Sequence, residues 1–408
     1  MKKLINFSLY DAGNSVFPML VLSAFTSSYF VNHVAADEQL GTALWQLTIG
    51  LAGIVIAILM PYIGNKADNM LNGRQRLLRL FSFICIFTIG LFYFVLPTQD
   101  YVLTALVIVF FGSVTYEASN SLYNSIMKDC SSDDLTLSSG LGFGTGFLGG
   151  TIILALLLVT LVLPKQNIFG ISMDNYLHLR FAHIILACWF LVFCIPLLYF
   201  SKFDQRASIS STKISQKVKS LLWDKGLTNI GRYLLARMLY MDGLIIVSTS
   251  IGIFGTSVMG LSIGQILIVG IIANIAGAFG CYLIGAVFKD DKKTVIITLL
   301  MLSLIVTVIS INKDPRAFML LTVAGTFFAG PLQSSSRVIM AKLIPNETQG
   351  LGFGMFTFSG KATAFIGPVC AAALTFLFSQ RLGFAFSIVL LLSGMLLMLQ
   401  VSYKQIKN

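Results

Sequence analysis

Long apolar runs, separated by short polar or Gly/Pro-containing breaks, make up most of the chain. Each run has the roughly 20 residues that an α-helix needs to cross the hydrocarbon core of a bilayer. Lys2 and Lys3 precede the first run as in a signal peptide, but Asp11, Asn14 and Pro18 interrupt it, which favours an uncleaved first span. We therefore predict an all-α membrane protein with twelve transmembrane helices, at residues 12–33, 41–63, 77–97, 101–126, 137–163, 179–201, 229–254, 261–288, 294–312, 317–343, 349–378 and 381–403.

One longer polar connection, residues 202–228, is rich in Lys and Ser and separates six spans from six. Such a segment is typical of a linker between two half-bundles. An internal repeat supports the division, because Gly-Leu-Gly-Phe-Gly opens both the fifth span, at 140–144, and the eleventh, at 350–354. We expect an N-terminal six-helix half at 1–201, a cytoplasmic linker at 202–228 and a C-terminal six-helix half at 229–408.

The composition excludes a soluble globular fold, because 56% of the 408 residues are hydrophobic and only 11% are charged, against roughly 25% charged residues in soluble domains. The net charge of +11 would favour a nucleic-acid partner in a soluble protein, but here its meaning depends on the loops. With a cytoplasmic N-terminus, outside loops carry only Lys165, Arg180, Lys313, Arg316 and Arg381. Inside segments carry nineteen basic residues: Lys2, Lys3, Lys66, Arg74, Arg76, Arg79, Lys128, Lys202, Arg206, Lys213, Lys217, Lys219, Lys225, Lys289, Lys292, Lys293, Lys342, Lys404 and Lys407. This bias predicts cytoplasmic N- and C-termini and explains the charge without nucleic acid.

The positions of the cysteines and histidines predict no disulfide framework, no metal site and no cofactor. Five of the six cysteines lie in apolar runs, none has CxxC spacing, and the three histidines are scattered. No paired carboxylates, nucleophile elbow or Walker motif stands in a context that supports catalysis, so we do not expect an enzyme. The glycines from Gly140 to Gly150 favour close helix packing over a phosphate-binding loop, because no strand precedes them.

Seven charged residues remain inside the predicted spans. A charge at the centre of a bilayer costs about 2.5–3.5 kcal/mol on insertion scales, so such residues face the bundle interior or a wet cavity. They occur on spans 1, 4, 7, 10 and 11 only, which points to one shared lumen. The seven are Asp11, Glu117, Arg232, Arg237, Asp242, Arg337 and Lys361.

Three spans carry their polar residues as a stripe along one helix face. In span 4, Glu117, Asn120, Ser121 and Asn124 recur at i, i+3, i+4 and i+7. Similar stripes on spans 1 and 10 are consistent with a common wet cavity, whereas the alternative is that these groups only bond one another between helices. The stripe of span 1 is Asp11, Asn14, Ser15 and Pro18, and that of span 10 is Gln333, Ser336 and Arg337.

We divide the candidate residues into two roles. A buried carboxyl exchanges protons nearer neutrality than an exposed one, so Glu117 is the leading proton carrier, with Asp242 and Asp11 as further candidates. Arg337 can grip a carboxylate or phosphate with two parallel hydrogen bonds. Asp11 and Arg232 lie near predicted span ends, where capping or snorkelling is the alternative, and structural ion pairing is the alternative for the deeper charges. The substrate-binding candidates are Asn14, Tyr116, Asn120, Asn124, Arg237, Gln333, Arg337 and Lys361.

The loop between spans 2 and 3 reads Gly64-Asn-Lys-Ala-Asp68-Asn-Met-Leu-Asn-Gly73-Arg74-Gln-Arg76. It resembles the signature of the major facilitator superfamily, with two extra residues between Asp68 and Gly73. The resemblance implies a cytoplasmic latch between the halves, made here by Asp68, Arg74 and Arg76. The counterpart in the second half is reduced to Lys-Asp-Asp-Lys-Lys at 289–293.

The segment Tyr10-Asp11-Ala-Gly-Asn14-Ser15-Val-Phe17 is similar to a signature of one branch of that superfamily. That branch includes the fungal vacuolar, autophagy-related amino-acid effluxers and many bacterial proteins. Residues 116–129 and 139–150 resemble it as well. The resemblance implies that spans 1, 4, 7 and 10 line a central cavity and that the halves rock around a site for small polar solutes.

From these observations we expect a proton-coupled secondary active transporter of an amino acid or a small organic anion. The deep charges support this substrate class, because two acids stand against three bases. The alternatives are an uncoupled uniporter, an exporter of another metabolite, and, in a different class, a membrane receptor or scaffold that does not transport. We expect a monomer in the lipid bilayer of a bacterial inner membrane, with a small-molecule substrate as its partner.

Overall fold

The computed structural model describes residues 2–131, 134–164, 168–201, 203, 207 and 212–402. Twelve helical spans in it are long and apolar enough to cross a membrane, which confirms the predicted multi-pass all-α fold. Lys165, Lys202, Arg206, Lys404 and Lys407 of the charge count lie outside the described residues.

The N-terminal half has six spans and one short extra helix. The spans are α1 (Lys2–Asn14) continued by η1 (Phe17–Leu22), α2 (Phe25–Tyr29) and η2 (Phe30–Val34); α3 (Glu38–Asp68); α4 (Gly73–Leu91) with η3 (Phe92–Phe94); η4 (Gln99–Tyr101) with α5 (Val102–Ser125); α7 (Leu135–Leu157) with η5 (Leu158–Val162); and η6 (Asp174–Tyr176) with α8 (Leu177–Phe200). The short helix α6 (Met127–Cys130) follows α5.

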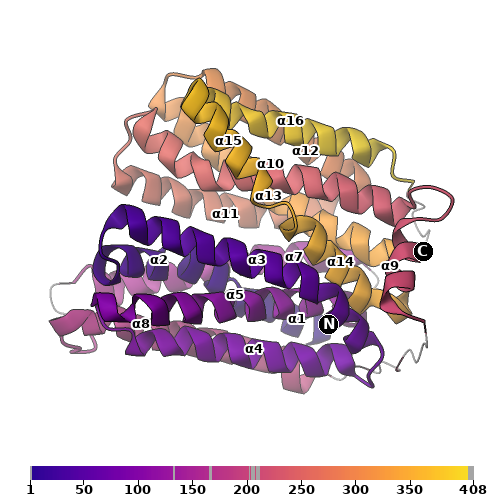
Figure 1. Cartoon of the computed structure of the whole chain (residues 1–408), viewed down its shortest axis with the longest axis horizontal. Coiled ribbons are helices and arrows are strands. Elements are labelled where there is room, and N and C mark those ends of the chain that lie inside the picture. Colours follow the sequence, from indigo (N-terminus) through magenta and orange to yellow (C-terminus); the bar gives the residue numbers. More distant parts are fainter. Residues whose placement is uncertain are drawn as a thin grey trace.

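The C-terminal half repeats this plan. Its spans are α10 (Asn229–Ser257); α11 (Ile263–Val287); α12 (Asp291–Ile311); α13 (Pro315–Leu343); η7 (Asn346–Thr348) with α14 (Gln349–Lys361) and α15 (Ile366–Leu377); and α16 (Gln380–Leu399). The connecting helix α9 (Ile214–Leu222) lies across one end of the bundle, where α1 begins and α16 ends (Figure 1). We call this the α9 end.

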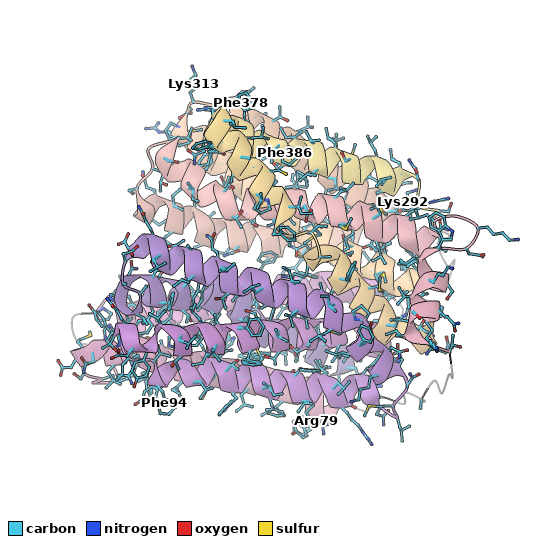
Figure 2. All side chains as sticks on the ribbon, viewed as in Figure 1. Arg79, Phe94, Lys292, Lys313, Phe378 and Phe386 are labelled. Carbon is cyan, nitrogen blue, oxygen red and sulfur yellow. The ribbon has the colours of Figure 1, made fainter. Side chains whose placement is uncertain are left out.

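The outer surface of the bundle is apolar over its whole length. Phe94 and Phe378 are 63% and 68% exposed at the end opposite α9, and Phe87 is 65% exposed on the side of α4. Figure 2 shows Phe94 and Phe378 there, with Arg79 and Lys292 at the α9 end. An apolar belt of this kind is stable only against lipid, since in water it would drive aggregation.

The first span begins earlier than the hydropathy pattern predicts. We expected it at 12–33, with Asp11 near its cytoplasmic end, and that position for Asp11 is wrong. Helix α1 begins at Lys2, so Asp11 lies nine residues, or roughly 14 Å, along the helix. The polar start of α1 is accommodated because Lys2 and Lys3 are exposed and Asn6 Nδ2 donates to Ser201 Oγ over 3.1 Å.

The halves approach each other most closely along two glycine-lined pairs of helices, α3 with α14 and α7 with α11. A Cβ on Gly64 would come within 2.1 Å of the Gly350 carbonyl oxygen, and one on Gly140 within 2.6 Å of the Cys281 carbonyl oxygen. The repeated glycine motif therefore has the same use in both halves, and the prediction of a helix interface for Gly140–Gly150 is confirmed. All these contacts lie toward the α9 end.

The eleventh span is not continuous, although the sequence pattern predicts one helix over 349–378. It breaks after Lys361, and α15 restarts at Ile366. In Figure 1, α14 lies beside α3 and α15 continues away from it toward α16, on which it packs. The break lets the halves touch near α9 while they diverge beyond Lys361.

Candidate functional site

An ion pair joins the two halves at the point where α15 turns away. Lys361 Nζ, at the end of α14, lies 2.7 Å from Glu117 Oε1 on α5. The two side chains are 35% and 15% exposed, so the pair is partly accessible. Two candidates predicted for different roles, a proton carrier and a substrate cation, are thus direct partners.

Further polar groups of α1 and α5 lie along the same face of α5, since Asn120 is three residues from Glu117. Asn14 Nδ2 donates to Asn120 Oδ1 over a long 3.5 Å contact, and Tyr116 stacks on Phe17 with 5.0 Å between ring centroids. The Asn14 side chain is buried, and its Oδ1 has no partner among the described residues. An unmatched buried oxygen is costly, which makes it a candidate acceptor for a ligand N–H.

Arg237 and Asp242, both on α10, contact the same α14–α15 segment within the C-terminal half. Arg237 Nη1 donates to the Phe356 carbonyl over 2.7 Å and to Ser359 Oγ over 3.0 Å, and its guanidinium lies 3.5 Å from the centre of the Phe356 ring. Thr363 Oγ1 donates to Asp242 Oδ1 over 3.2 Å. These two residues hold the broken helix on either side of Lys361.

A second, sealed layer lies closer to the α9 end. Arg337 on α13 is 1% exposed, and each of its three guanidinium nitrogens donates a hydrogen bond. The acceptors are Asp11, Asn124 and Ser139, all in the N-terminal half; Nη1 and Nη2 are both 3.3 Å from Asp11 Oδ2. Tyr123 also donates to that oxygen, over 2.8 Å. Asn124 lies seven residues from Glu117, so the two layers are roughly 10 Å apart along α5.

The predicted latch residues form a third layer at the α9 end itself. Both Asp68 oxygens accept backbone N–H groups at the start of α14, from Gly350 over 2.9 Å and from Leu351 over 2.8 Å. Arg74 holds this carboxylate, with Nε 3.8 Å away, and donates to the Ser125 carbonyl. Asp68 therefore accepts the otherwise unpaired N–H groups at the N-terminus of α14, a helix of the opposite half.

A matching set of contacts on the other side of the bundle was not expected from the sequence. Asp291 is fully buried at the start of α12, accepts from Thr136 on α7, and lies 2.7 Å from Lys342 Nζ. Nearby, Lys289 Nζ lies 2.5 Å from Asp134. One hint is present in the sequence, because Asp291 lies in the segment 289–293 that resembles a reduced second latch. Its partners could not be predicted, because they are distant in the sequence.

The pKa of the Asp134 carboxyl reflects this contact. Partial burial by itself would raise the pKa, but hydrogen bonds from Lys289 and from the Leu137 amide hold it below its usual range. Asp134 is therefore ionised at neutral pH and pairs with a lysine of the opposite half. This contact is more exposed than the Asp291 pair.

The remaining candidates lie elsewhere. Gln333 lines a cavity of about 300 Å³ between α10, α12 and α13, with Phe147 from α7 and otherwise mostly apolar side chains. Arg76 is exposed on the outer side of α4, apart from Asp68 and Arg74. In the described part of the chain, no group of three His, Cys, Asp or Glu residues could hold a metal ion.

Comparison with known proteins identifies the family. The sequence pattern of the family described as "Vacuole effluxer Atg22 like" matches residues 26–134 and 128–408. The chain belongs to this family. The uncharacterized MFS-type transporter YxiO of Bacillus subtilis (strain 168) is 24% identical to this Atg22-like chain over 400 residues, which are 94% of the chain and 90% of the relative.

Fungal members are similar over a shorter stretch. Autophagy-related protein 22 of Cryptococcus neoformans var. neoformans serotype D is 24% identical over 282 residues, which are 62% of this Atg22-like chain and 48% of the fungal protein. The resemblance of the sequence to the autophagy-related branch of the major facilitator superfamily, a superfamily of transporters, is thus confirmed.

Solved structures agree on the fold. The human organic anion transporter MFSD10 (TETRAN) has a TM-score of 0.71 at 16% identity, covering 97% of this chain and 98% of its own. The proton:xylose symporter XylE has a TM-score of 0.74 at 14% identity, covering 98% and 94%. At these identities the likeness establishes the fold of the Atg22-like chain, which is that of the major facilitator superfamily.

Proposed function

We propose that this chain is a secondary active transporter that moves a small polar solute by alternating access between its two halves. The observation that carries the proposal is the Glu117–Lys361 pair, in which opposite charges from the two halves meet 2.7 Å apart and stay partly accessible. The description of the family as vacuole effluxers supports a transport role.

An amino acid suits this pair for a physical reason. Separating two charges in a low-dielectric site is costly unless each charge obtains a new partner. A solute with both a carboxylate and an ammonium group offers one to Lys361 and the other to Glu117. Asn14 Oδ1, buried without a partner among the described residues, can accept a further ammonium hydrogen. A small organic anion would engage Lys361 only, and Glu117 would then have to bind a proton.

The coupling proton, in this proposal, is carried by Asp11. Its carboxylate faces Arg337 only while the α9 end is closed, because the two residues belong to different halves. When that end opens, a proton can neutralise Asp11 in place of the departing guanidinium. Glu117 and Asp242 remain the other candidate carriers. If none of these three carboxyls carries a proton, the protein is an uncoupled uniporter.

We assign the α9 end to the cytoplasm, from the excess of basic residues in the segments found there. The conformation described above is then closed to the cytoplasm. The Bacillus relative supports a bacterial inner membrane as the location.

Matched ligands test the substrate class. Alanine, leucine, glutamate and lysine, their methyl esters and N-acetyl derivatives, and succinate should be compared for thermal stabilisation of the purified chain. We expect free amino acids to stabilise it and both blocked forms to fail. Stabilisation by succinate and N-acetyl forms alone would favour an organic anion. Binding without uptake into proteoliposomes would indicate a receptor instead.

A further inference from the structure

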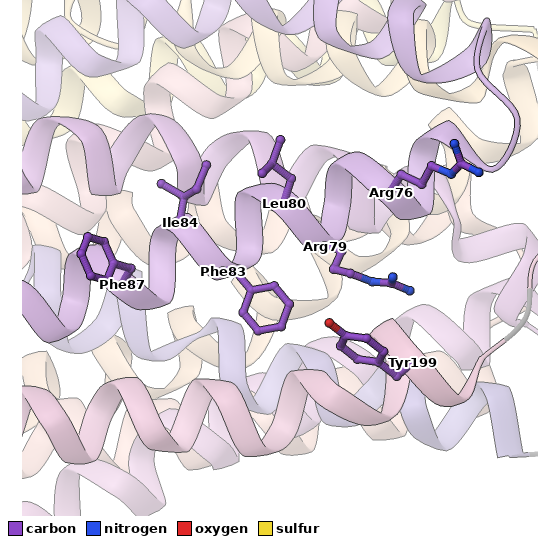
Figure 3. A pocket seen from close by; sticks show the side chains of 7 residues that line it. All are labelled: Arg76, Arg79, Leu80, Phe83, Ile84, Phe87 and Tyr199. Carbon is purple, nitrogen blue, oxygen red and sulfur yellow. The ribbon is translucent and has the colours of Figure 1, made fainter.

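A shallow groove of about 460 Å³ runs along the outer face of α4 beside the end of α8 (Figure 3). Its α4 residues recur every three or four positions and so lie on one helix face. Two of them are basic and stand nearest the α9 end, and the rest are apolar. The lining residues are Arg76, Arg79, Leu80, Phe83, Ile84, Phe87 and Tyr199.

The two arginines keep donor capacity free. Arg76 is exposed, and no ion pair or hydrogen bond engages its guanidinium within the described residues. Arg79 donates through Nη2 to the Leu198 carbonyl over 2.7 Å and lies 4.3 Å from the centre of the Tyr199 ring. Its Nη1 donates no hydrogen bond among those residues. A planar guanidinium with unused donors is suited to a phosphate group.

The groove is held in shape by its neighbours. Gln75, one position before Arg76, donates to the carbonyls of Leu198 and Ser201 over 3.2 and 2.8 Å. Together with Arg79 it fastens the end of α8 to the first turns of α4. The site is therefore largely preformed, and a ligand need not order it on binding.

The groove as a whole has the length of about half the hydrocarbon core. From Arg76 to Phe87 the helix advances eleven residues, roughly 16 Å, which is about half the thickness of the hydrocarbon core. Leu80 and Phe87 are 51% and 65% exposed on this face, which the bundle presents to lipid. The groove thus combines two cationic groups at its α9 end with an apolar stretch from Leu80 to Phe87, roughly 10 Å along the helix.

We propose that this groove binds one anionic phospholipid, with its phosphate on Arg76 and Arg79 and an acyl chain along Phe83 and Phe87. The charge of the two arginines selects an anionic headgroup over a zwitterionic one, because near a membrane each basic residue adds attraction for anionic lipid only. The proposal depends on the membrane fold and not on which solute is transported.

Native mass spectrometry of the full chain tests the proposal. Protein from nanodiscs of mixed phosphatidylcholine and phosphatidylglycerol should retain one phosphatidylglycerol in preference to phosphatidylcholine. Arg76→Gln and Arg79→Gln should each lower this retention about fivefold, the factor expected for one basic contact with anionic lipid. Arg232→Gln, an exposed arginine at the same end of the other half, should leave it unchanged. Ile84→Trp, which fills the groove without altering charge, should also displace the lipid.

Three results would overturn the proposal. Equal retention of the two lipids would mean an unselective lipid shell. Unchanged phosphatidylglycerol in Arg76→Gln, a variant at an exposed and unpaired side chain that should fold normally, would remove the arginine site. Full competition by glycerophosphoglycerol, which has the headgroup but no chains, would show that a free phosphate suffices and that the apolar groove has no part.

Discussion

Arg337 on α13 and Asp11 on α1 form an ion pair between the two halves, with 3.3 Å from Nη1 to Oδ2. The arginine side chain is 2% exposed, so this contact seals the bundle between the Glu117–Lys361 layer and the α9 end. Any opening at that end must separate the pair. Arg337 therefore contributes to the closed state whether or not it also meets the solute.

Arg337→Ala should populate the conformation that is open at the α9 end. The change leaves Asp11 buried without its cation, an arrangement that costs about 3–5 kcal/mol, and opening relieves it. Cys281 is a buried residue of α11, with its carbonyl oxygen against Gly140 of α7 and its Sγ near Gly330 of α13, and it should become several-fold more reactive to N-ethylmaleimide, as measured by mass spectrometry. Cys194, buried inside the N-terminal half, is the control. A parallel rise at Cys194 would indicate unfolding, and no rise at Cys281 would exclude a closing role.

Asp68→Asn should slow turnover and leave equilibrium solute affinity within a few fold. The amide keeps one acceptor for the start of α14 but loses the charge that favours a helix N-terminus, a loss of about 0.5–2 kcal/mol. Asp290→Asn is the matched control, because Asp290 caps α12 within its own half through the Lys293 amide. If both variants slow solute exchange equally, the contact of Asp68 between the halves does not control turnover.

Lys342→Met should destabilise the protein far more than Lys289→Met. The first change deprives the fully buried Asp291 of an ion pair and should cost about 3 kcal/mol or more. The second removes an exposed contact worth up to about 1 kcal/mol. Melting temperatures in detergent check the ranking, and a reversed order would show that the buried Asp291–Lys342 pair is not the stronger of the two contacts.

The Lys289–Asp134 contact should also depend on pH. The pKa of Asp134 is lower in the folded protein than its usual value, so its stabilising effect is present above the unfolded pKa and lost as pH falls through the folded one. In an acid titration of the melting temperature, Asp134→Asn should lose this part of the acid sensitivity. Wild-type acid sensitivity in the variant would assign the effect to other carboxyls.

Glu117→Gln and Lys361→Gln should change which blocked amino acids bind. Without the Glu117 charge, an ammonium group on the ligand matters less. The affinity of N-acetyl forms relative to free amino acids should therefore be higher in Glu117→Gln than in the wild type. Without the Lys361 charge, the methyl esters should gain instead. Thermal shift with the same ligand pairs checks this crossed pattern, and an identical loss for all ligands in both variants would assign the pair a structural role.

Single cysteines should report the orientation. Ser220→Cys on α9 should label with a membrane-impermeant maleimide only from the cytoplasm, and Asp174→Cys only from outside, because the basic segments gather at the α9 end. Both positions are exposed. Labelling of both from one face of the membrane would contradict the twelve-span topology.

The twelve spans were predictable from the sequence, because the cost of placing polar backbone in hydrocarbon forces long apolar helices with polar breaks. The polar stripe of Glu117, Asn120 and Asn124 was predictable for the same reason, since a polar face in a membrane must point inward. The use of Gly140 at a helix interface also followed from local pattern, because small residues permit close packing.

Only the tertiary structure decided which charge meets which. Arg337 and Asp11 are 326 positions apart, and Lys361 meets Glu117 across the two halves at the last residue of α14. The break itself, and the burial of Asp11 by an early start of α1, depend on packing against other helices. Pairing between distant charges depends on how the two folded halves pack against each other. A local sequence pattern carries no information about that packing.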